Sequence, residues 1–349
     1  MTAPHAPIAL GRPVGPGHPP WIVAELSANH LGDLARAHAI VDAAAAAGCD
    51  AIKFQTFTPA SMTLAGDGPG FRIERGPWAG RTLWDLYEEA HLPWAWHGEL
   101  FAHARAVGLV PFSTPFDPDA VAALGELAPL VWKIASFEAG DDELIAACAA
   151  TGRPIILSTG MASDDEVAHA VAAARGHGCR ELILLHCVSG YPTPPEQMNL
   201  RRLTTLARLA PVGLSDHSPG AVAPIAAVAL GACVIEKHLT LARADGGPDA
   251  GFSLEPDEMA EVVRGCRAAW AALGDGGAAR PPVEAESRGF RRSLYAVSDI
   301  AVGEPLSRAN VRAIRPGYGL APRHLGALLG RPARVAIARG TPLAWELVA

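Results

Sequence analysis

Two patterns of apolar and polar positions alternate along this chain. Short runs rich in valine and isoleucine are followed by longer alanine-rich runs with helical spacing, and the pair recurs eight times. Such repetition is typical of βα units that build a parallel sheet. The predicted strands cover residues 21–27, 50–56, 110–115, 131–136, 154–160, 181–188, 212–218 and 233–240, and the clearest predicted helices cover 34–47, 97–106, 164–175, 221–230 and 256–273.

Eight such units within about 250 residues match the size of a closed (β/α)8 TIM barrel. We therefore predict an α/β fold in which residues 1–273 form a barrel domain. Residues 59–93 form one long insertion after the second strand, and insertions of that length commonly serve as lids or binding elements. A linker rich in Gly, Ala and Pro at 274–287 leads to a small β-rich domain at 288–349.

The composition is that of a large globular protein. The chain has 349 residues, half of them hydrophobic, and a formal net charge of −7. No stretch approaches the roughly 18 consecutive apolar residues of a membrane span. The N-terminus lacks the apolar core of a signal peptide, so we expect a cytoplasmic protein that does not bind a membrane. Its six scattered cysteines favour buried free thiols over disulfides or a zinc site.

Charge is distributed unevenly. Residues 288–349 hold ten arginines against three acidic residues, a local charge of +7 that leaves −14 for the rest of the chain. Because these arginines are dispersed and few aromatic residues accompany them, we do not expect nucleic-acid binding. Only three of the 29 basic residues are lysines, and Lys53, Lys133 and Lys237 all fall in predicted strands.

Polar residues gather at the carboxyl ends of the predicted strands, where barrel enzymes carry their active sites. Side chains alternate between the two faces of a strand, so Lys53 shares a face with Gln55 and Glu236 with His238. The residues concerned are Glu25, Ser27, Asn29, Lys53, Gln55, Ser113, Thr114, Lys133, Ser136, Glu138, Ser158, Thr159, Ser189, Tyr191, Ser215, Asp216, His217, Glu236, Lys237 and His238.

His217 and His238 end neighbouring predicted strands, whose spacing of about 4.8 Å would let two imidazoles share one ion. With further positions open to water or carboxylate, such a pair suits a divalent ion such as Mn²⁺, Mg²⁺ or Co²⁺. Two polar histidines at a barrel rim without metal are the alternative. The pattern thus leaves the metal open.

Lys53 and Lys133 bring two cations to one region, and the hydroxyls of Ser136, Ser158 and Ser215 add hydrogen-bond donors. Such a cluster fits a phosphate or a carboxylate. A lysine that forms a Schiff base, as in aldolases on the same barrel, is the alternative chemistry. Several carboxylates are candidate bases or metal neighbours, and the sequence does not rank them: Glu25, Glu138, Asp216, Glu236 and Asp249.

Seven motifs that follow the strands in order resemble the sialic acid synthase family. They are IVAELSANH (22–30), AIKFQTFTP (51–59), KIASFE (133–138), LSTGMAS (157–163), LLHCVSGYPTP (184–194), GLSDHS (213–218) and VIEKHLT (234–240). The stretches RRSLYAVSDIAVGE (291–304) and IRPGYGL (314–320) resemble the antifreeze-like (SAF) domain of that family. The resemblance therefore covers nearly the whole chain.

This resemblance implies an enzyme that condenses phosphoenolpyruvate with an open-chain acetamido sugar, giving a nine-carbon 2-keto acid and phosphate. By position, phosphoenolpyruvate would be held by Lys53, Lys133, Ser136, Ser158, Ser189 and Ser215, with Thr114 nearby. His217 and His238 would bind the divalent ion. Near the sugar or the water bound to the metal would lie Glu25, Gln55, Tyr191 and Asp249, and Glu138 belongs to the same substrate-binding set. Arg315 would reach the barrel of a partner subunit in a domain-swapped homodimer.

Further motifs resemble the pseudaminic acid synthase branch of the family. They include LYEEAHLPWAWH (86–97), PFSTPFD (111–117) and FSLEP (252–256). The sugar of that branch, 2,4-diacetamido-2,4,6-trideoxy-L-altrose, lacks the 6-hydroxyl, so we expect a more apolar pocket to which Phe57, Phe116, Trp84 and Trp94 could contribute. Synthases of N-acetylneuraminate or legionaminic acid are the main alternatives. A non-catalytic carbohydrate-binding protein is a more distant one.

Overall fold

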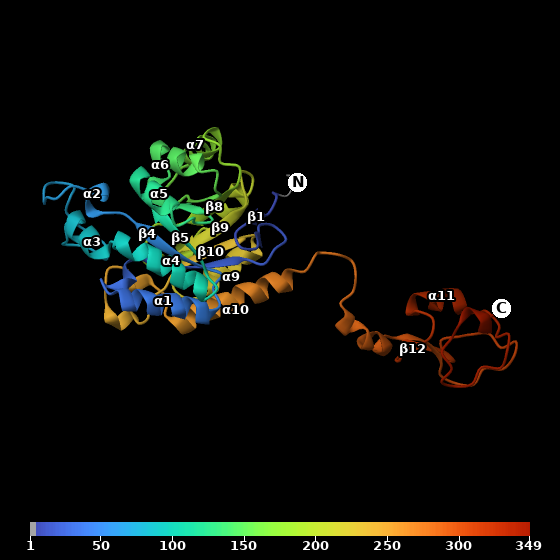
Figure 1. Cartoon of the computed structure of the whole chain (residues 1–349). Helices are drawn as coiled ribbons and strands as arrows, with labels where there is room; N and C mark the ends of the chain where they lie inside the picture. Colours follow the sequence, from blue (N-terminus) through green and yellow to red (C-terminus); the bar gives the residue numbers. More distant parts are fainter. Residues whose placement is uncertain (1–4) are drawn as a thin grey trace. The chain divides into compact units, whose positions relative to one another are not determined.

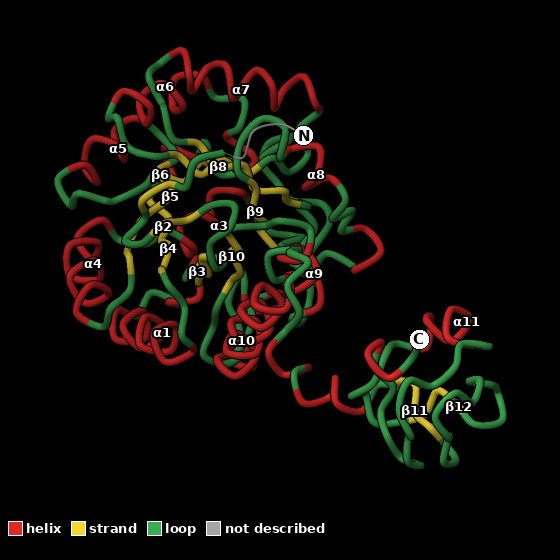
Figure 2. The backbone as a smooth tube through the Cα atoms, turned by 90° about the vertical axis from the view of Figure 1, so that its right-hand side faces the viewer, coloured by secondary structure: helices red, strands yellow, loops and turns green. Residues whose placement is uncertain are grey.

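A computed structural model describes residues 5–349 and confirms the predicted barrel. Eight parallel strands close on themselves, because the last strand pairs with both the first and the seventh. Figure 2 shows the helices as a ring around these strands. The strands are β3 (Trp21–Glu25), β4 (Ala51–Thr56), β5 (Val110–Pro115), β6 (Trp132–Ile134), β7 (Ile155–Ser158), β8 (Leu182–Cys187), β9 (Val212–Asp216) and β10 (Val234–His238).

The helices begin and end at residues whose chemistry explains their limits. Asp33 caps the first helix by accepting hydrogen bonds from the backbone of Ala35 and Arg36, and Gly48 ends it at φ +86°. A left-handed residue at this point favours glycine, which has no Cβ to clash. The helices of the ring are α1 (Leu34–Ala47), α4 (His97–Ala106), α5 (Pro118–Gly125), α6 (Asp142–Ala150), α7 (Asp164–Gly176), α8 (Arg202–Leu206), α9 (Val222–Ala229) and α10 (Pro256–Leu273).

Strand alternation divides the apolar residues into two cores. Outward-facing positions such as Ile52 and Phe54 pack against the helices in one large cluster. Inward-facing positions near the strand starts, such as Val23, Ala51 and Phe112, fill the barrel interior. Further along each strand the inward positions become polar, so the barrel is closed at its amino-terminal end and polar at its carboxyl-terminal end.

A short hairpin that the sequence patterns did not predict lies at the amino-terminal end of the barrel. Its strands are β1 (Ile8–Ala9) and β2 (Pro13–Val14), and their apolar side chains join the interior core. Arg12 from its turn is paired with Asp50, the residue before β4, at 3.0 Å. Figure 1 shows β1 at the end of the barrel opposite to α2 and α3, so the hairpin covers the floor of the barrel.

The insertion at residues 59–93, hereafter the excursion, is folded. It contains α2 (Pro59–Met62) and α3 (Leu83–Ala90), with a small antiparallel turn between them in which Arg72 bridges Thr82. Thr82 then caps α3 by accepting a hydrogen bond from the backbone of Asp85. The excursion thus adds a structured element to the carboxyl-terminal end of the barrel (Figure 1).

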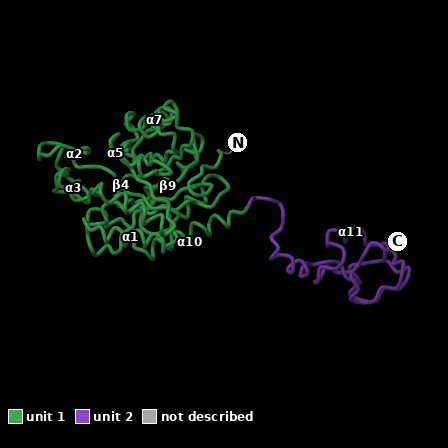
Figure 3. Tube along the Cα trace, in the orientation of Figure 1, with its two compact units in different colours: residues 1–274 green, residues 275–349 purple. Residues whose placement is uncertain are grey.

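The chain separates into two compact units, residues 1–274 and 275–349 (Figure 3). The second unit is small and β-rich, as predicted for the end of the chain. It pairs β11 (Ser293–Ala296) with β12 (Val311–Ile314) in antiparallel fashion, adds the short helix α11 (Leu325–Leu328), and has its own apolar core around Leu294, Ile300 and Leu306. Among residues 5–349, no helix is both long and apolar enough to cross a membrane.

Candidate active site

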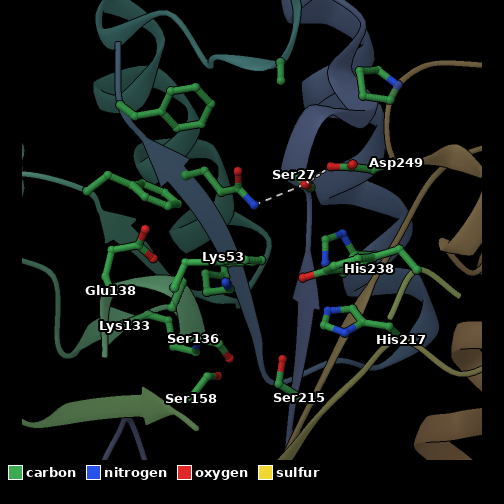
Figure 4. A pocket seen from close by; sticks show the side chains of 18 of the residues that line it. Ser27, Lys53, Lys133, Ser136, Glu138, Ser158, Ser215, His217, His238 and Asp249 are labelled. Atoms are coloured by element: carbon green, nitrogen blue, oxygen red, sulfur yellow. Dashed lines mark hydrogen bonds between the residues drawn. The ribbon is translucent and has the colours of Figure 1, made fainter. Parts of the chain in front are cut away.

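A cavity of about 350 Å³ opens at the carboxyl-terminal end of the barrel. Figure 4 shows two facing groups of side chains, with Lys133, Ser136 and Ser158 on one side and His217 and His238 on the other. The sequence-predicted residues that line the cavity are Lys53, Gln55, Lys133, Ser136, Glu138, Ser158, Tyr191, Ser215, His217, His238 and Asp249. The fold therefore brings polar side chains from separate sequence motifs into one cavity.

Other predicted residues lie behind the lining or in the second unit. Glu25 is fully buried beneath Lys53, and Thr114 accepts a hydrogen bond from the same ammonium at 3.1 Å. The Ser189 hydroxyl is buried near Gly160. Arg315 lies in the second unit, directly after β12, and is exposed.

A buried charge network forms the base of the cavity. The Lys53 ammonium lies 2.6 Å from Oε2 of Glu25 and 3.3 Å from Oε1 of Glu236. Burial alone would lower the pKa of Lys53, but the two carboxylates outweigh it and raise that pKa. Burial would raise the pKa of Glu236, yet Lys133 and Lys53 hold it below its usual value. Lys53 is thus kept as a cation and Glu236 as an anion.

Lys133 has a different electrostatic environment. Its ammonium donates to the carbonyl of Ile134 at 3.1 Å and lies 3.8 Å from Oε1 of Glu236. Burial lowers the pKa of Lys133 to about 8; Glu236 opposes this shift and the Lys53 cation adds to it. The two lysines therefore share one carboxylate, and Lys133 has capacity left for an anionic ligand.

The hydroxyl groups beside the lysines form a cradle for an anion. The hydroxyls of Ser158 and Ser189 are buried without a hydrogen-bond partner among the described residues. The backbone of Gly160 donates to Ser136 Oγ at 3.0 Å, and a Cβ at Gly160 would come within 2.8 Å of that oxygen and 2.6 Å of Ser189 Oγ. Glycine thus lets the backbone approach both serines, and the unpartnered donors suit a phosphate group.

The two histidines fit a divalent metal ion. Their ring centroids lie 5.3 Å apart, and His217 Nδ1 lies 3.0 Å from the carbonyl of Val188, which leaves Nε2 as the acceptor toward the cavity. His238 Nδ1 is buried with no partner among residues 5–349. Burial, followed by the positive charges nearby, keeps the pKa of His238 well below its usual value. A neutral, unpartnered imidazole is the form that binds metal. The described residues contain no group of three or more His, Cys, Asp or Glu arranged for a metal, so water or substrate would complete such a site.

Asp249 closes the side of the cavity next to the histidines. One of its oxygens accepts a hydrogen bond from the hydroxyl of Ser27, and that hydroxyl accepts from Gln55 Nε2 at 3.2 Å (Figure 4). Burial raises the pKa of Asp249, although the bond from Ser27 acts against the shift. The chain Gln55–Ser27–Asp249 therefore fixes three polar side chains from three segments at the cavity wall.

Glu138 is a lining carboxylate whose pKa lies near neutral pH. It follows β6 and lines the cavity, and its Oε2 is buried with no partner among the described residues. Burial raises the pKa of Glu138 to about 7, although Lys133 opposes the shift. A base works best when its pKa is near the working pH, so Glu138 is better placed for this task than Glu25, which is locked to Lys53.

The apolar side of the cavity differs in part from the sequence prediction. Phe57 and Phe116 line it, whereas Trp84 and Trp94 do not. Trp78, from the tip of the excursion, lines the cavity instead, together with Leu86, Tyr87 and Ala90 of α3. Residues 63–82 contain no helix or strand in the structure. The hydrophobic periodicity of the sequence therefore could not show which of their side chains face the cavity.

Sequence reasoning also left several lining residues out of the proposed substrate and metal sets. Glu236 had been one unranked carboxylate, although its parity with His238 already placed it on the inner face. Ser27 had been noted only as a polar strand-end residue. Phe252 and Cys187 carried no distinguishing signal, because an apolar side chain next to a strand is more often core. All four line the cavity.

Comparison with known proteins gives consistent matches over both units. The model of the NeuB family matches residues 40–278, and that of the SAF domain matches residues 291–349. The chain is 43% identical over 325 residues to a pseudaminic acid synthase of Campylobacter jejuni subsp. jejuni (serotype O:23/36), covering 93% of this chain and 95% of the relative.

Two further likenesses extend the comparison. The chain is 34% identical to an N,N'-diacetyllegionaminic acid synthase of Legionella pneumophila, with 96% of each chain covered. The crystal structure of the N-acetylneuraminic acid synthetase of Leptospira borgpetersenii, in complex with citrate, superimposes with a TM-score of 0.73 at 33% identity, covering 82% of this chain and 96% of that one.

Proposed function

Because this chain belongs to the NeuB family, we propose that it is a pseudaminic acid synthase. It condenses phosphoenolpyruvate with 2,4-diacetamido-2,4,6-trideoxy-L-altrose and releases phosphate. The observation that carries the proposal is that the cavity has two chemically different sides. Lysines and unpartnered serine hydroxyls lie on one side, and a pair of histidines lies on the other. The first group suits an anionic donor, and the second suits the oxygen of an electrophile.

Phosphoenolpyruvate binds on the lysine side. Its phosphate accepts hydrogen bonds from Ser136, Ser158 and Ser189, and Lys53 and Lys133 neutralise its charge. The hydroxyls of Ser158 and Ser189 have no partner among the described residues, so binding replaces no hydrogen bond that they make within the protein. The cradle holds the enol carbon toward the histidine side.

His217 and His238 are the residues that would hold a divalent ion, and Asp249 lies beside them in the cavity lining. When bound, the ion supplies Lewis acidity toward a carbonyl oxygen. The residues around it have their own tasks. Asp249 and Gln55 are fixed through Ser27 and orient the hydroxyl groups of the sugar near its aldehyde.

The reaction forms one carbon–carbon bond, and at C2 it replaces the carbon–oxygen bond to phosphate with one to the oxygen of water. C3 of phosphoenolpyruvate attacks C1 of the open-chain sugar, whose aldehyde oxygen becomes a hydroxyl. Water adds at C2, and Glu138 takes the first proton that this water loses, because Glu138 lines the cavity and burial raises its pKa to about 7. The bond from C2 to the phosphate oxygen then breaks as C2 becomes a carbonyl, leaving a 2-keto acid and free phosphate. Of the two protons that the water loses, one ends on the former aldehyde oxygen and the other on the phosphate.

A phosphate-release assay with three sugars tests this proposal. We expect the altrose derivative to give the highest kcat/KM, followed by the legionaminic acid precursor and N-acetylmannosamine. Faster turnover of N-acetylmannosamine or of the legionaminic acid precursor would assign the chain to another branch of the family. Phosphoenolpyruvate with ¹⁸O in its bridging oxygen checks the bond that breaks, because label found in the keto acid would contradict cleavage between C2 and oxygen.

One observation favours a Schiff-base aldolase as a second candidate. Burial lowers the pKa of Lys133 to about 8, which makes a neutral and nucleophilic amine accessible. In the synthase Lys133 acts only by charge. Borohydride added with substrate distinguishes the two, since a covalent adduct on Lys133 or Lys53 requires the aldolase.

The assembly and location belong to the same proposal. We infer a homodimer in which Arg315 of one subunit contacts phosphoenolpyruvate or sugar at the cavity of its partner. The net charge of +7 over residues 288–349 supports this, because the substrate is anionic and the barrel is acidic. The six cysteines are free and buried, which supports work in the reducing cytoplasm.

A further inference from the structure

The excursion supplies a chemically uniform part of the cavity wall. Its lining residues are Met62, Trp78, Leu86, Tyr87 and Ala90, none of which is charged. Every charged side chain of the lining lies on a barrel strand or just after one, except Asp249 on the loop after β10. The barrel therefore provides the charges for the reaction, and the excursion provides an apolar surface.

Trp78 lies at the tip of the excursion and is fixed by a defined hydrogen bond. The tip is a turn in which Ile73 donates to Arg81 at 2.9 Å and Gly80 donates to Ile73 at 2.8 Å. From this turn the indole Nε1–H of Trp78 donates to the carbonyl of Pro248 at 2.7 Å. Pro248 directly precedes Asp249, so the bond joins the excursion to the loop that carries the carboxylate of the site.

The indole ring also continues an aromatic wall that reaches the histidines. Its centroid lies 5.5 Å from Tyr191 and 6.3 Å from Phe252. Tyr191 in turn lies 4.4 Å from His217, and Phe252 lies 5.0 Å from His238. A single aromatic residue thus separates Trp78 from each of the two histidines.

We propose that Trp78 is a specificity-determining residue that packs against the apolar edge of a deoxy, acetamido-substituted sugar. This inference rests on the proposed function. The methyl groups of such a sugar bury favourably against an indole ring. A sugar with a hydroxyl at C6 instead of hydrogen would lose a hydrogen bond to water without gaining a partner at the indole, whose only polar group already donates to Pro248.

Two variants of Trp78 and a matched control test the inference. Trp78→Ala removes the ring, Trp78→Phe keeps an aromatic face but removes the N–H donor, and Trp84→Ala removes an indole of the same excursion that does not line the cavity. Each is assayed by phosphate release with the altrose derivative and with N-acetylmannosamine. Thermal unfolding of each variant checks that the barrel is intact.

For Trp78→Ala we expect KM for the altrose derivative to rise by about ten-fold or more, as for other lost apolar pocket contacts, with KM for phosphoenolpyruvate nearly unchanged. The preference for the deoxy sugar should fall by a similar factor. Trp78→Phe should keep most of the preference, and Trp84→Ala all of it. A Trp78→Ala variant with the wild-type preference would overturn the inference. Failure of wild-type protein to use the altrose derivative would instead refute the proposed function.

Discussion

The ammonium group of Lys237 donates a 2.7 Å hydrogen bond to Oδ2 of Asp216, between adjacent strands β10 and β9. Both residues are almost completely buried, at 1% exposure each. The same ammonium donates to the carbonyls of Ser218, at 2.6 Å, and Gly220, at 3.2 Å. Lys237 does not line the cavity, so it fastens the segment after His217 without touching substrate.

We therefore expect Lys237→Met to act on stability. Removing one partner of a buried pair leaves an uncompensated charge and costs about 3–5 kcal/mol. Lys237→Arg should cost less but still destabilise, because a broad guanidinium must enter a site shaped for a compact ammonium. Urea unfolding measures the loss, and kcat of the folded Lys237→Arg protein should stay within a few-fold of wild type. An unchanged unfolding midpoint for Lys237→Met would show that the pair contributes nothing.

The sequence could predict those site residues that lie on strands, because side chains alternate between the two faces of a strand. Inward parity is a local property, so Lys53, Lys133 and His238 could be placed on one face without knowledge of their neighbours. Trp78 could not, because its position depends on a hydrogen bond to Pro248, 170 residues away in sequence. The proposed role of Arg315 requires a second subunit, so the residue pattern of one chain does not indicate it and only the family resemblance predicted it.

The charge of Lys133 should govern the response to alkaline pH. Its pKa of about 8 lies below its usual value because of burial, so the ammonium loses its proton as pH rises through 8. Attraction to phosphoenolpyruvate is lost with it. We expect kcat/KM for phosphoenolpyruvate, which reports the free enzyme, to fall about ten-fold per pH unit above 8.

Lys133→Arg provides the control for this pH profile. A guanidinium stays protonated throughout, so the decrease near pH 8 should disappear while activity falls severely at every pH, because the larger group does not fit the cradle. We expect Lys53→Arg to lose activity severely as well, since Glu25 and Glu236 enclose that ammonium. An alkaline decrease that persists in Lys133→Arg would assign it to another group.

Glu138 should determine the acidic side of the profile. Burial raises its pKa to about 7, so the base is active only above that pH. We expect Glu138→Gln to lower both kcat and kcat/KM by about 10²–10⁴-fold and to remove the decrease of kcat/KM below pH 7. Glu143→Gln is the matched control, because it makes the same change at an exposed residue of α6 and should leave kcat unchanged. If Glu138→Gln keeps the wild-type kcat, another carboxylate must orient the water.

Chelation should reveal the role of the histidine pair. We expect EDTA to abolish phosphate release and added Mn²⁺ to restore it, because two imidazoles, with no larger ligand group among residues 5–349, hold an ion only moderately. Mn²⁺ binding can be measured without turnover, from the loss of the free-ion signal in electron paramagnetic resonance. His238→Ala should remove this binding, whereas His169→Ala, at an exposed site on α7, should retain it. Full Mn²⁺ binding by His238→Ala would exclude the pair as the metal site.

Subunit mixing can test whether Arg315 acts across a dimer. Arg315→Ala and Lys133→Met should each be nearly inactive alone. In a mixed dimer, the barrel of the Arg315→Ala subunit keeps Lys133 and receives Arg315 from the other subunit, so one complete site forms. Random exchange should restore about a quarter of wild-type activity, because half of the dimers are mixed and each has one complete site. If Arg315 acted on its own barrel, no combination would hold both residues in one site and the mixture would stay inactive.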